Sequence, residues 1–168
     1  MARVMILMGS ISDEETVRPC AQVLKKLGID FKAEVSSAHR SPDRTEKLVK
    51  EAEGAGCRVF ICAAGMAAHL AGAVAAHSIR PVIGIPITAS ALGGMDALLS
   101  TLMMPPGFPV AAMSLDKAGA GNAAWFAAQI LALEDEELAE RLRSAREAMA
   151  EAVEEAGRKL RAADWSNT

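Results

Sequence analysis

The chain has 168 residues, of which 51% are hydrophobic and 23% charged, a composition typical of a globular protein and not of a disordered one. A chain of this length fits one compact core, so we predict a single domain over residues 1–168. Eighteen Lys and Arg against 21 Asp and Glu leave a net charge of -3, and no basic cluster of the kind that binds phosphate backbones is present. Nucleic acid is therefore not an expected partner.

The sequence also argues against export and membrane insertion. The first apolar run begins too close to Met1 for a secretory signal, and no run approaches membrane-spanning length. Cys20, Cys57 and Cys62 have neither zinc nor redox spacing, which predicts buried reduced thiols. We expect a soluble cytoplasmic protein.

Short apolar runs alternate with amphipathic segments along the chain. The predicted strands cover residues 3–8, 30–35, 57–63, 81–86 and 110–114. The predicted helices cover residues 14–27, 42–53, 68–77, 95–103, 121–133 and 135–160. Pro19 lies inside the first helix, where a lost backbone hydrogen bond predicts a kink or a late helix start. This alternation predicts an α/β fold, with a five-stranded parallel sheet and helices on both faces.

The last predicted helix carries an apolar stripe opposite a charged face. It lies beyond the last strand, so the stripe could pack on its own domain or on a neighbouring subunit. The core is expected over about 3–133 and the helix over about 135–160. The stripe consists of Leu138, Leu142, Ala145, Met149 and Val153.

Ligands of open parallel sheets bind beyond the carboxyl ends of the strands, and three such segments carry reactive side chains. The first, residues 9–13, presents Ser10, Ser12 and Asp13 before a helix N-terminus, where free amides favour a phosphate. Asp13 could instead bind ribose hydroxyls. The alternative is that Ser12 or Asp13 only caps the helix. The segment lacks the glycine pattern of a dinucleotide fingerprint and the G-K-[ST] of a P-loop.

The second segment follows the second strand and contains Ser37, His39 and Arg40. The guanidinium of Arg40 suits a phosphate, and an imidazole titrates near neutral pH, which suits proton transfer by His39. The alternative is a surface histidine and arginine in a loop that enters a helix.

The third segment, residues 64–72, is rich in small residues and places His69 at a helix start. A capping or core-edge role for His69 is nearly as well supported as substrate contact, whereas His77 at the helix end is expected to be structural. The glycine-rich segments 91–96 and 117–122 are predicted as loops at the same end of the sheet, where they could line this site or a neighbour's.

The combined motifs resemble the N5-carboxyaminoimidazole ribonucleotide mutases, the catalytic subunit family of phosphoribosylaminoimidazole carboxylase. The resemblance covers about residues 4–133. It departs at Met66, where the family usually has glycine, and at Ala71, where it usually has proline. The matching segments are 8–13, 37–40 with Pro42 and Asp43, 67–70, 82–86, Met104 and Pro105 with Gly107 and 109–110, 117–119 and 122–124.

The resemblance implies a flavodoxin-like three-layer sandwich that assembles as a homo-octamer and uses no metal or other cofactor. His39 would be the general acid and base, and His69 would line the carboxylate pocket. Ser10 and Arg40 would lie near the substrate phosphate and Asp13 at the ribose, with Ser12 and Ser37 also expected to contact the substrate.

The implied reaction moves the carboxylate of N5-carboxyaminoimidazole ribonucleotide to ring carbon C4, through release and recapture of carbon dioxide. The segment 67–70 resembles the mutase branch; direct carboxylation of aminoimidazole ribonucleotide is the alternative. A non-catalytic flavodoxin-like nucleotide-binding module is a third reading. It is disfavoured by the few aromatic residues and by the absence of an acidic cluster after the first strand.

Overall fold

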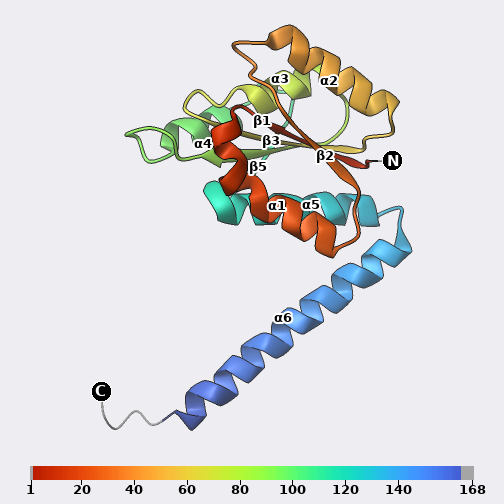
Figure 1. The fold of residues 1–168 in the computed structure, drawn as a ribbon, viewed down its shortest axis with the longest axis vertical. Coiled ribbons are helices and arrows are strands. Elements are labelled where there is room, and N and C mark those ends of the chain that lie inside the picture. The colour runs from red at the N-terminus through yellow and green to blue at the C-terminus, as the bar shows by residue number, and fades with distance from the viewer. Residues whose placement is uncertain (1, 164–168) are drawn as a thin grey trace.

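The computed structural model describes residues 2–163 (Figure 1). Five parallel strands form one sheet in the order β2, β1, β3, β4, β5. The strands are β1 (Val4–Met8), β2 (Phe31–Val35), β3 (Val59–Gly65), β4 (Val82–Ile87) and β5 (Ala111–Ala112). The predicted α/β fold with a five-stranded parallel sheet is confirmed.

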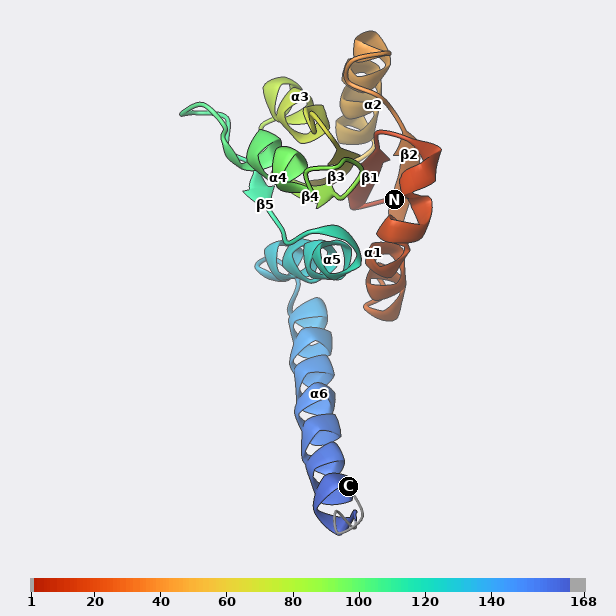
Figure 2. The same cartoon turned by 90° about the vertical axis from the view of Figure 1, so that its left-hand side faces the viewer.

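Helices cover both faces of the sheet and make the three-layer arrangement visible in Figure 2. On one face lie α2 (Pro42–Gly54), α3 (Leu70–His77) and α4 (Met95–Leu102). On the other lie α1 (Glu14–Lys26), which follows the short 3-10 helix η1 (Ile11–Asp13), and α5 (Asp116–Ala132). The long α6 (Glu136–Ala162) comes last.

The central strands are apolar throughout because both of their faces are covered. Along β1, Val4 and Ile6 point into the core beneath α1 and α5, whereas Met5 and Leu7 point into the core beneath α2 and α3. All four side chains are at most 4% exposed. This alternation follows from the two-residue repeat of a strand, and it explains why the sequence of β1 shows no polar alternation.

The predicted fifth strand is much longer than the observed one. Only Ala111 and Ala112 pair with β4, and the N–H of Met113 then donates to the carbonyl of Gly84. The chain turns away at Ser114 to enter α5. The prediction of a strand over residues 110–114 is therefore wrong at its ends.

Helix α5 begins at Asp116, so the glycine-rich segment 117–122 is helical and not the loop that we predict from sequence. The reason lies at Gly119, where a Cβ atom would stand 1.7 Å from the carbonyl oxygen of Ser114. Only glycine lets the first turns of α5 pack this closely on the preceding backbone. Glycine signals a loop in isolation, but here it permits a close contact inside a helix.

Pro19 does not delay the first helix, because α1 is continuous from Glu14 to Lys26. The late start that we considered is therefore wrong. Burial of Val17, Cys20 and Leu24 against the core beneath α5 offsets the backbone hydrogen bond that a proline removes.

The first turns of helix α6 are buried, and the rest of the helix is exposed. Its first turns pack on the body of the chain through Leu138, Leu142 and Ala145, which are all buried. Beyond these residues the helix extends away from the sheet (Figures 1 and 2), and Met149 and Val153 are 45% and 74% exposed. Both halves of the predicted stripe are thus apolar, but only the first is covered.

The three cysteines are free and buried, as predicted, and burial raises the pKa of the Cys20 thiol to about 12.

Within residues 2–163, no helix combines the length and the apolar character needed to cross a membrane.

Candidate functional site

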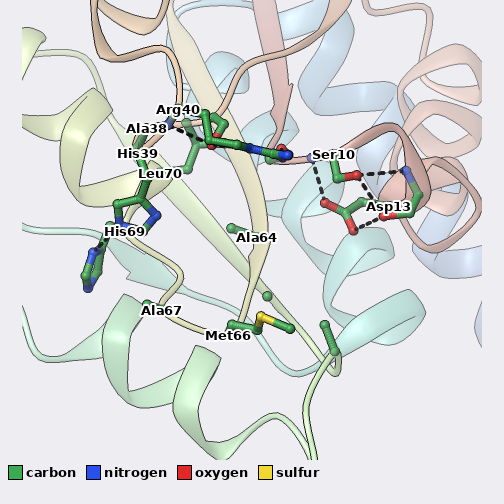
Figure 3. Close-up of a pocket in the computed structure, with 15 residues that line it drawn as sticks. Ser10, Asp13, Ala38, His39, Arg40, Ala64, Met66, Ala67, His69 and Leu70 are labelled. Atoms are coloured by element: carbon green, nitrogen blue, oxygen red, sulfur yellow. Dashed lines mark hydrogen bonds between the residues drawn. The ribbon is translucent and has the colours of Figure 1, made fainter.

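A cavity of about 430 Å³ opens beyond the carboxyl ends of β1, β2 and β3. All seven residues that we predict for the site line it, because these three strands are neighbours in the sheet. In Figure 3 the two histidines gather on one side and Ser10 and Asp13 on the other. The seven residues are Ser10, Ser12, Asp13, Ser37, His39, Arg40 and His69.

The first loop is held by a reciprocal cap. The Oγ of Ser10 accepts a hydrogen bond from the N–H of Ser12 at 3.3 Å, and the N–H of Ser10 donates to Oδ2 of Asp13 at 3.1 Å. The capping residue of η1 is Ser10, with Asp13 as its partner, whereas Asp13 at the N-cap position of α1 makes no side-chain capping hydrogen bond to that helix. The alternative that Ser12 or Asp13 only caps the helix is therefore wrong. The cap does not remove these residues from the site, because Ser10 and Asp13 both still line the cavity.

Asp13 is only 9% exposed, and burial raises the pKa of its carboxyl group above the ordinary range. Hydrogen bonds from the backbone of Ser10 and the side chain of Ser12 counteract this effect in part. A largely buried carboxylate that faces a cavity is stabilised in its ionised form by additional hydrogen-bond donors. Hydroxyl groups of a ligand would provide them.

The second loop presents Arg40 toward the first. The Oγ of Ser37 accepts from the backbone N–H of Arg40 at 3.3 Å and from its Nε at 3.4 Å, and a terminal nitrogen donates to the carbonyl of Gly9 at 3.4 Å. These donor–acceptor distances are longer than those of typical hydrogen bonds, so the bonds are weak. The guanidinium is thus oriented between two loops with capacity left for an anion.

The third loop brings a second imidazole to the first. Nδ1 of His69 lies 2.8 Å from Nε2 of His39, and the rings meet edge to face, with centroids 4.9 Å apart and an angle of 76° between planes. His69 occupies the N-cap position of α3 but makes no capping hydrogen bond with its side chain. The side-chain capping alternative is therefore wrong, and the core-edge alternative is wrong as well, because His69 is exposed. The ring of His69 instead contacts the ring of His39.

Two residues of the cavity wall, Met66 and Ala89, are not among the seven that we predict for the site, although Met66 stands out in the sequence as a departure from the family's glycine. Met66 lines the cavity in a left-handed conformation, with φ of 54°. Ala89 reaches the cavity from the loop after β4, and that loop is tied down at Thr88, whose N–H donates to Oδ1 of Asp116 at 2.8 Å. The segment 91–96, which we considered as a wall of the site, is not among the described lining residues.

The lining chemistry suits a phosphorylated polar molecule. It combines hydroxyls, a guanidinium, two imidazoles and a carboxylate, and its only rings are those imidazoles. The described lining thus offers a flavin no Phe, Tyr or Trp ring to stack on. Within residues 2–163, no three His, Cys, Asp or Glu side chains are grouped as a metal ion would require.

Comparison with known proteins points to one family. The family described as AIR carboxylase matches residues 3–152. N5-carboxyaminoimidazole ribonucleotide mutase of Brucella melitensis is 49% identical over 152 residues, which is 90% of this chain and 94% of that protein. The mutase of Escherichia coli K12 is 46% identical over 90% of both chains. The crystal structure of Treponema denticola PurE superposes with a TM-score of 0.85 at 32% identity, covering 94% of this chain and 97% of that one.

Proposed function

Since the chain belongs to the AIR carboxylase family, we propose that it is an isomerase of purine biosynthesis that converts N5-carboxyaminoimidazole ribonucleotide to 4-carboxyaminoimidazole ribonucleotide. The relatives at 46% to 49% identity carry the name of this mutase. The family resemblance predicted from the sequence motifs is thereby confirmed. The relatives support an enzyme and not a flavodoxin-like binding module.

The observation that carries the proposal is the pair of imidazoles in one cavity with an arginine and a buried carboxylate. We assign the substrate phosphate to Arg40 and Ser10, because a guanidinium fork beside a hydroxyl suits a phosphate. We assign the ribose hydroxyls to Asp13, whose buried carboxylate needs donors. Ser12 and Ser37 are assigned to contacts with the same ribonucleotide.

These assignments leave the imidazole ring of the substrate near the histidines. In the proposed reaction the bond between the exocyclic nitrogen and the carboxylate carbon breaks, and carbon dioxide is released within the cavity. Ring carbon C4 then attacks this carbon dioxide, and His39 removes the C4 proton. The exocyclic nitrogen regains one proton, so the net change moves one proton and one carboxylate between two atoms of the same molecule.

His69 is assigned to the carboxylate side of the pocket, next to His39. Its ring can supply or accept the hydrogen bond that selects the protonated nitrogen of His39, since the two nitrogens are 2.8 Å apart. The donors and acceptors that the reaction uses are thus side chains of this chain, and none of the proposed steps is assigned to a metal or another cofactor.

We further propose a homo-octamer in the cytoplasm. The support for self-association is the uncovered part of α6, where Met149 and Val153 are exposed on a helix that extends from the body. A neighbouring subunit would cover this stripe. Three free buried thiols are compatible with a reducing compartment.

The test is conversion of N5-carboxyaminoimidazole ribonucleotide to its C4-carboxylated isomer without ATP, by the wild type and by His39→Asn. Aminoimidazole ribonucleotide with bicarbonate serves as a second substrate. We expect fast isomerisation that the variant loses while it still binds the ribonucleotide. Turnover of the second substrate alone would reassign the chain to direct carboxylation, and no turnover of either would overturn the proposal.

A further inference from the structure

Two buried hydroxyl groups lie at the base of the turn that carries His39. Ser36 and Thr45 are each 1% exposed, and their hydroxyl oxygens lie 2.8 Å apart. Ser36 directly follows β2, and Thr45 lies near the start of α2. Burial of a hydroxyl group costs free energy unless the group is hydrogen-bonded, so the presence of two of them here requires a reason beyond filling space.

The turn between these two residues presents His39 and Arg40 to the cavity (Figure 3). It is closed by Ser41, whose N–H and Oγ both donate to the carbonyl of Ser37, at 2.9 and 3.1 Å. Ser41 occupies the N-cap position of α2 but makes no capping hydrogen bond with its side chain, so its hydroxyl closes the turn instead. Because His39 and Arg40 are exposed, the backbone of the turn largely sets where they lie.

The hydroxyl of Thr45 joins the two ends of this turn. Its Oγ1 donates to the carbonyl of Ser41 at 3.3 Å, and a threonine hydroxyl carries a single hydrogen. Ser36 must therefore be the donor in the 2.8 Å contact with Thr45. The N–H of Ser36 in turn donates to the carbonyl of Met8 at 2.8 Å. The chain entering the turn and the chain leaving it are thus fixed to one buried oxygen atom, and through Ser36 to the end of β1.

Stability alone does not account for these hydroxyls. A bond from a threonine hydroxyl to the carbonyl four residues earlier does not strengthen a helix, and two apolar side chains of the same shape could replace the pair at little cost. A fully hydrogen-bonded buried pair instead specifies one arrangement of the segments that it joins. Here that segment is the turn that carries His39, the residue assigned to proton transfer.

We propose that Thr45 and Ser36 are positioning residues that hold His39 in place for proton transfer. His39 must reach the proton at ring carbon C4 while its Nε2 stays 2.8 Å from Nδ1 of His69. A displacement of about 1 Å can lower a rate by about 100-fold. Anchoring the turn to a buried hydroxyl pair prevents such a displacement of an exposed imidazole. The proposal rests on the isomerase function proposed above.

The test compares Thr45→Val, Thr45→Ser and the double variant Ser36→Ala with Thr45→Val, by the isomerase assay and by thermal unfolding. Thr45→Val keeps the side-chain shape but leaves the Ser36 hydroxyl buried without its acceptor, so we expect kcat to fall about 10-fold or more and Tm to fall as well. Thr45→Ser keeps the hydroxyl and should recover most of kcat. The double variant leaves neither hydroxyl unpaired, so its Tm should return toward that of the wild type while kcat stays low.

Thr101→Val is the matched control. Thr101 is 2% exposed, its hydroxyl donates to the carbonyl of Ala97 at 2.8 Å, which is the same kind of bond in α4, and it does not line the cavity. We expect this variant to keep the kcat of the wild type.

Three outcomes would overturn the positioning role and leave the isomerase intact. They are wild-type kcat in Thr45→Val, recovery of kcat together with Tm in the double variant, and an equal loss of kcat in Thr101→Val. Absence of turnover in the wild type would instead overturn the isomerase function, and the positioning role with it.

Discussion

Nε2 of His39 and Nδ1 of His69 lie 2.8 Å apart across a sequence separation of 30 residues. In such a contact one nitrogen must carry a hydrogen and the other must accept it. If both rings were charged, both atoms would be donors and the contact would be lost. The pair can therefore hold at most one extra proton while it remains paired, which links the protonation of His39 to the presence of His69.

The first prediction concerns this link. His69→Ala is expected to lower kcat by about 10- to 100-fold, because His39 loses the partner that orients its ring. It is also expected to shift the pH profile of kcat/KM while KM for the ribonucleotide changes little. His69→Asn, which retains a polar group near the same place, should recover part of the rate. An unchanged pH profile in the alanine variant would reduce His69 to a structural role.

Asp13 provides a prediction in which stability and binding move in opposite directions. Burial raises the pKa of its carboxyl in the folded chain above the unfolded value, so the ionised group opposes folding at neutral pH. As pH falls through the raised pKa, the carboxyl group becomes protonated and this penalty on the free energy of unfolding is lost. Asp13→Asn keeps an acceptor for the N–H of Ser10 and removes the charge.

We therefore expect Asp13→Asn to be at least as stable as the wild type at pH 7, with the difference shrinking as pH falls below the raised pKa. Ribonucleotide affinity is expected to fall by about 10- to 100-fold, because the charged acceptor for the ribose hydroxyls is lost. Thermal unfolding across pH and binding by calorimetry measure both effects. A variant that binds normally would remove Asp13 from the ribose site.

Arg40 allows a matched comparison with Arg44. Arg40→Lys removes the planar fork that we assign to the phosphate, so KM for the ribonucleotide should rise about 10- to 100-fold. Inhibition by inorganic phosphate should weaken in parallel. Arg44 is nearby but pairs with Glu34 at 2.9 Å and does not line the cavity, so Arg44→Lys is expected to leave KM unchanged. Equal effects of the two changes would contradict the phosphate assignment.

The sequence predicts which residues reach the site, but it does not predict how the loop after β3 orients them. The positions of Ser10, His39 and His69 follow from strand ends, and neighbouring parallel strands must bring those ends together. The pairing of the two imidazoles depends on the path of the loop after β3, which turns at Met66 with a positive φ. Side-chain type does not indicate such a turn, because methionine rarely adopts it.

The errors in α5 and β5 have a shared cause. Glycines at 119 and 121 look like a loop when only local preference is considered. The contact between Gly119 and the carbonyl of Ser114 joins residues only five positions apart, and it exists only once the first turn of the helix has formed. This close backbone approach explains why glycine stands inside a helix that begins at Asp116, and that early start leaves only Ala111 and Ala112 in the strand before it.

Those two glycines also give a stability prediction. Gly119→Ala places a Cβ atom against backbone that cannot give way like a flexible side chain, and should destabilise the fold by about 3 kcal/mol. Nothing lies within 4 Å of a Cβ added at Gly121, so Gly121→Ala should instead stabilise the helix by roughly 0.5–1 kcal/mol. Denaturant unfolding of both variants measures the contrast. Similar values for the two would mean that the close approach at Gly119 is relieved at little cost.

The uncovered stripe of α6 gives the last prediction. If neighbouring subunits cover Met149 and Val153, then Met149→Gln with Val153→Gln should convert the assembly to smaller species, because burial of each apolar side chain is worth about 1.5–3 kcal/mol. Glu147→Gln with Glu151→Gln changes the opposite face of the same turns and is expected to leave the mass unchanged. Light scattering after size exclusion distinguishes the two pairs. Because Leu138, Leu142 and Ala145 stay packed on the body, the first pair should keep the fold of each subunit, so an unchanged mass would count directly against the stripe as an interface.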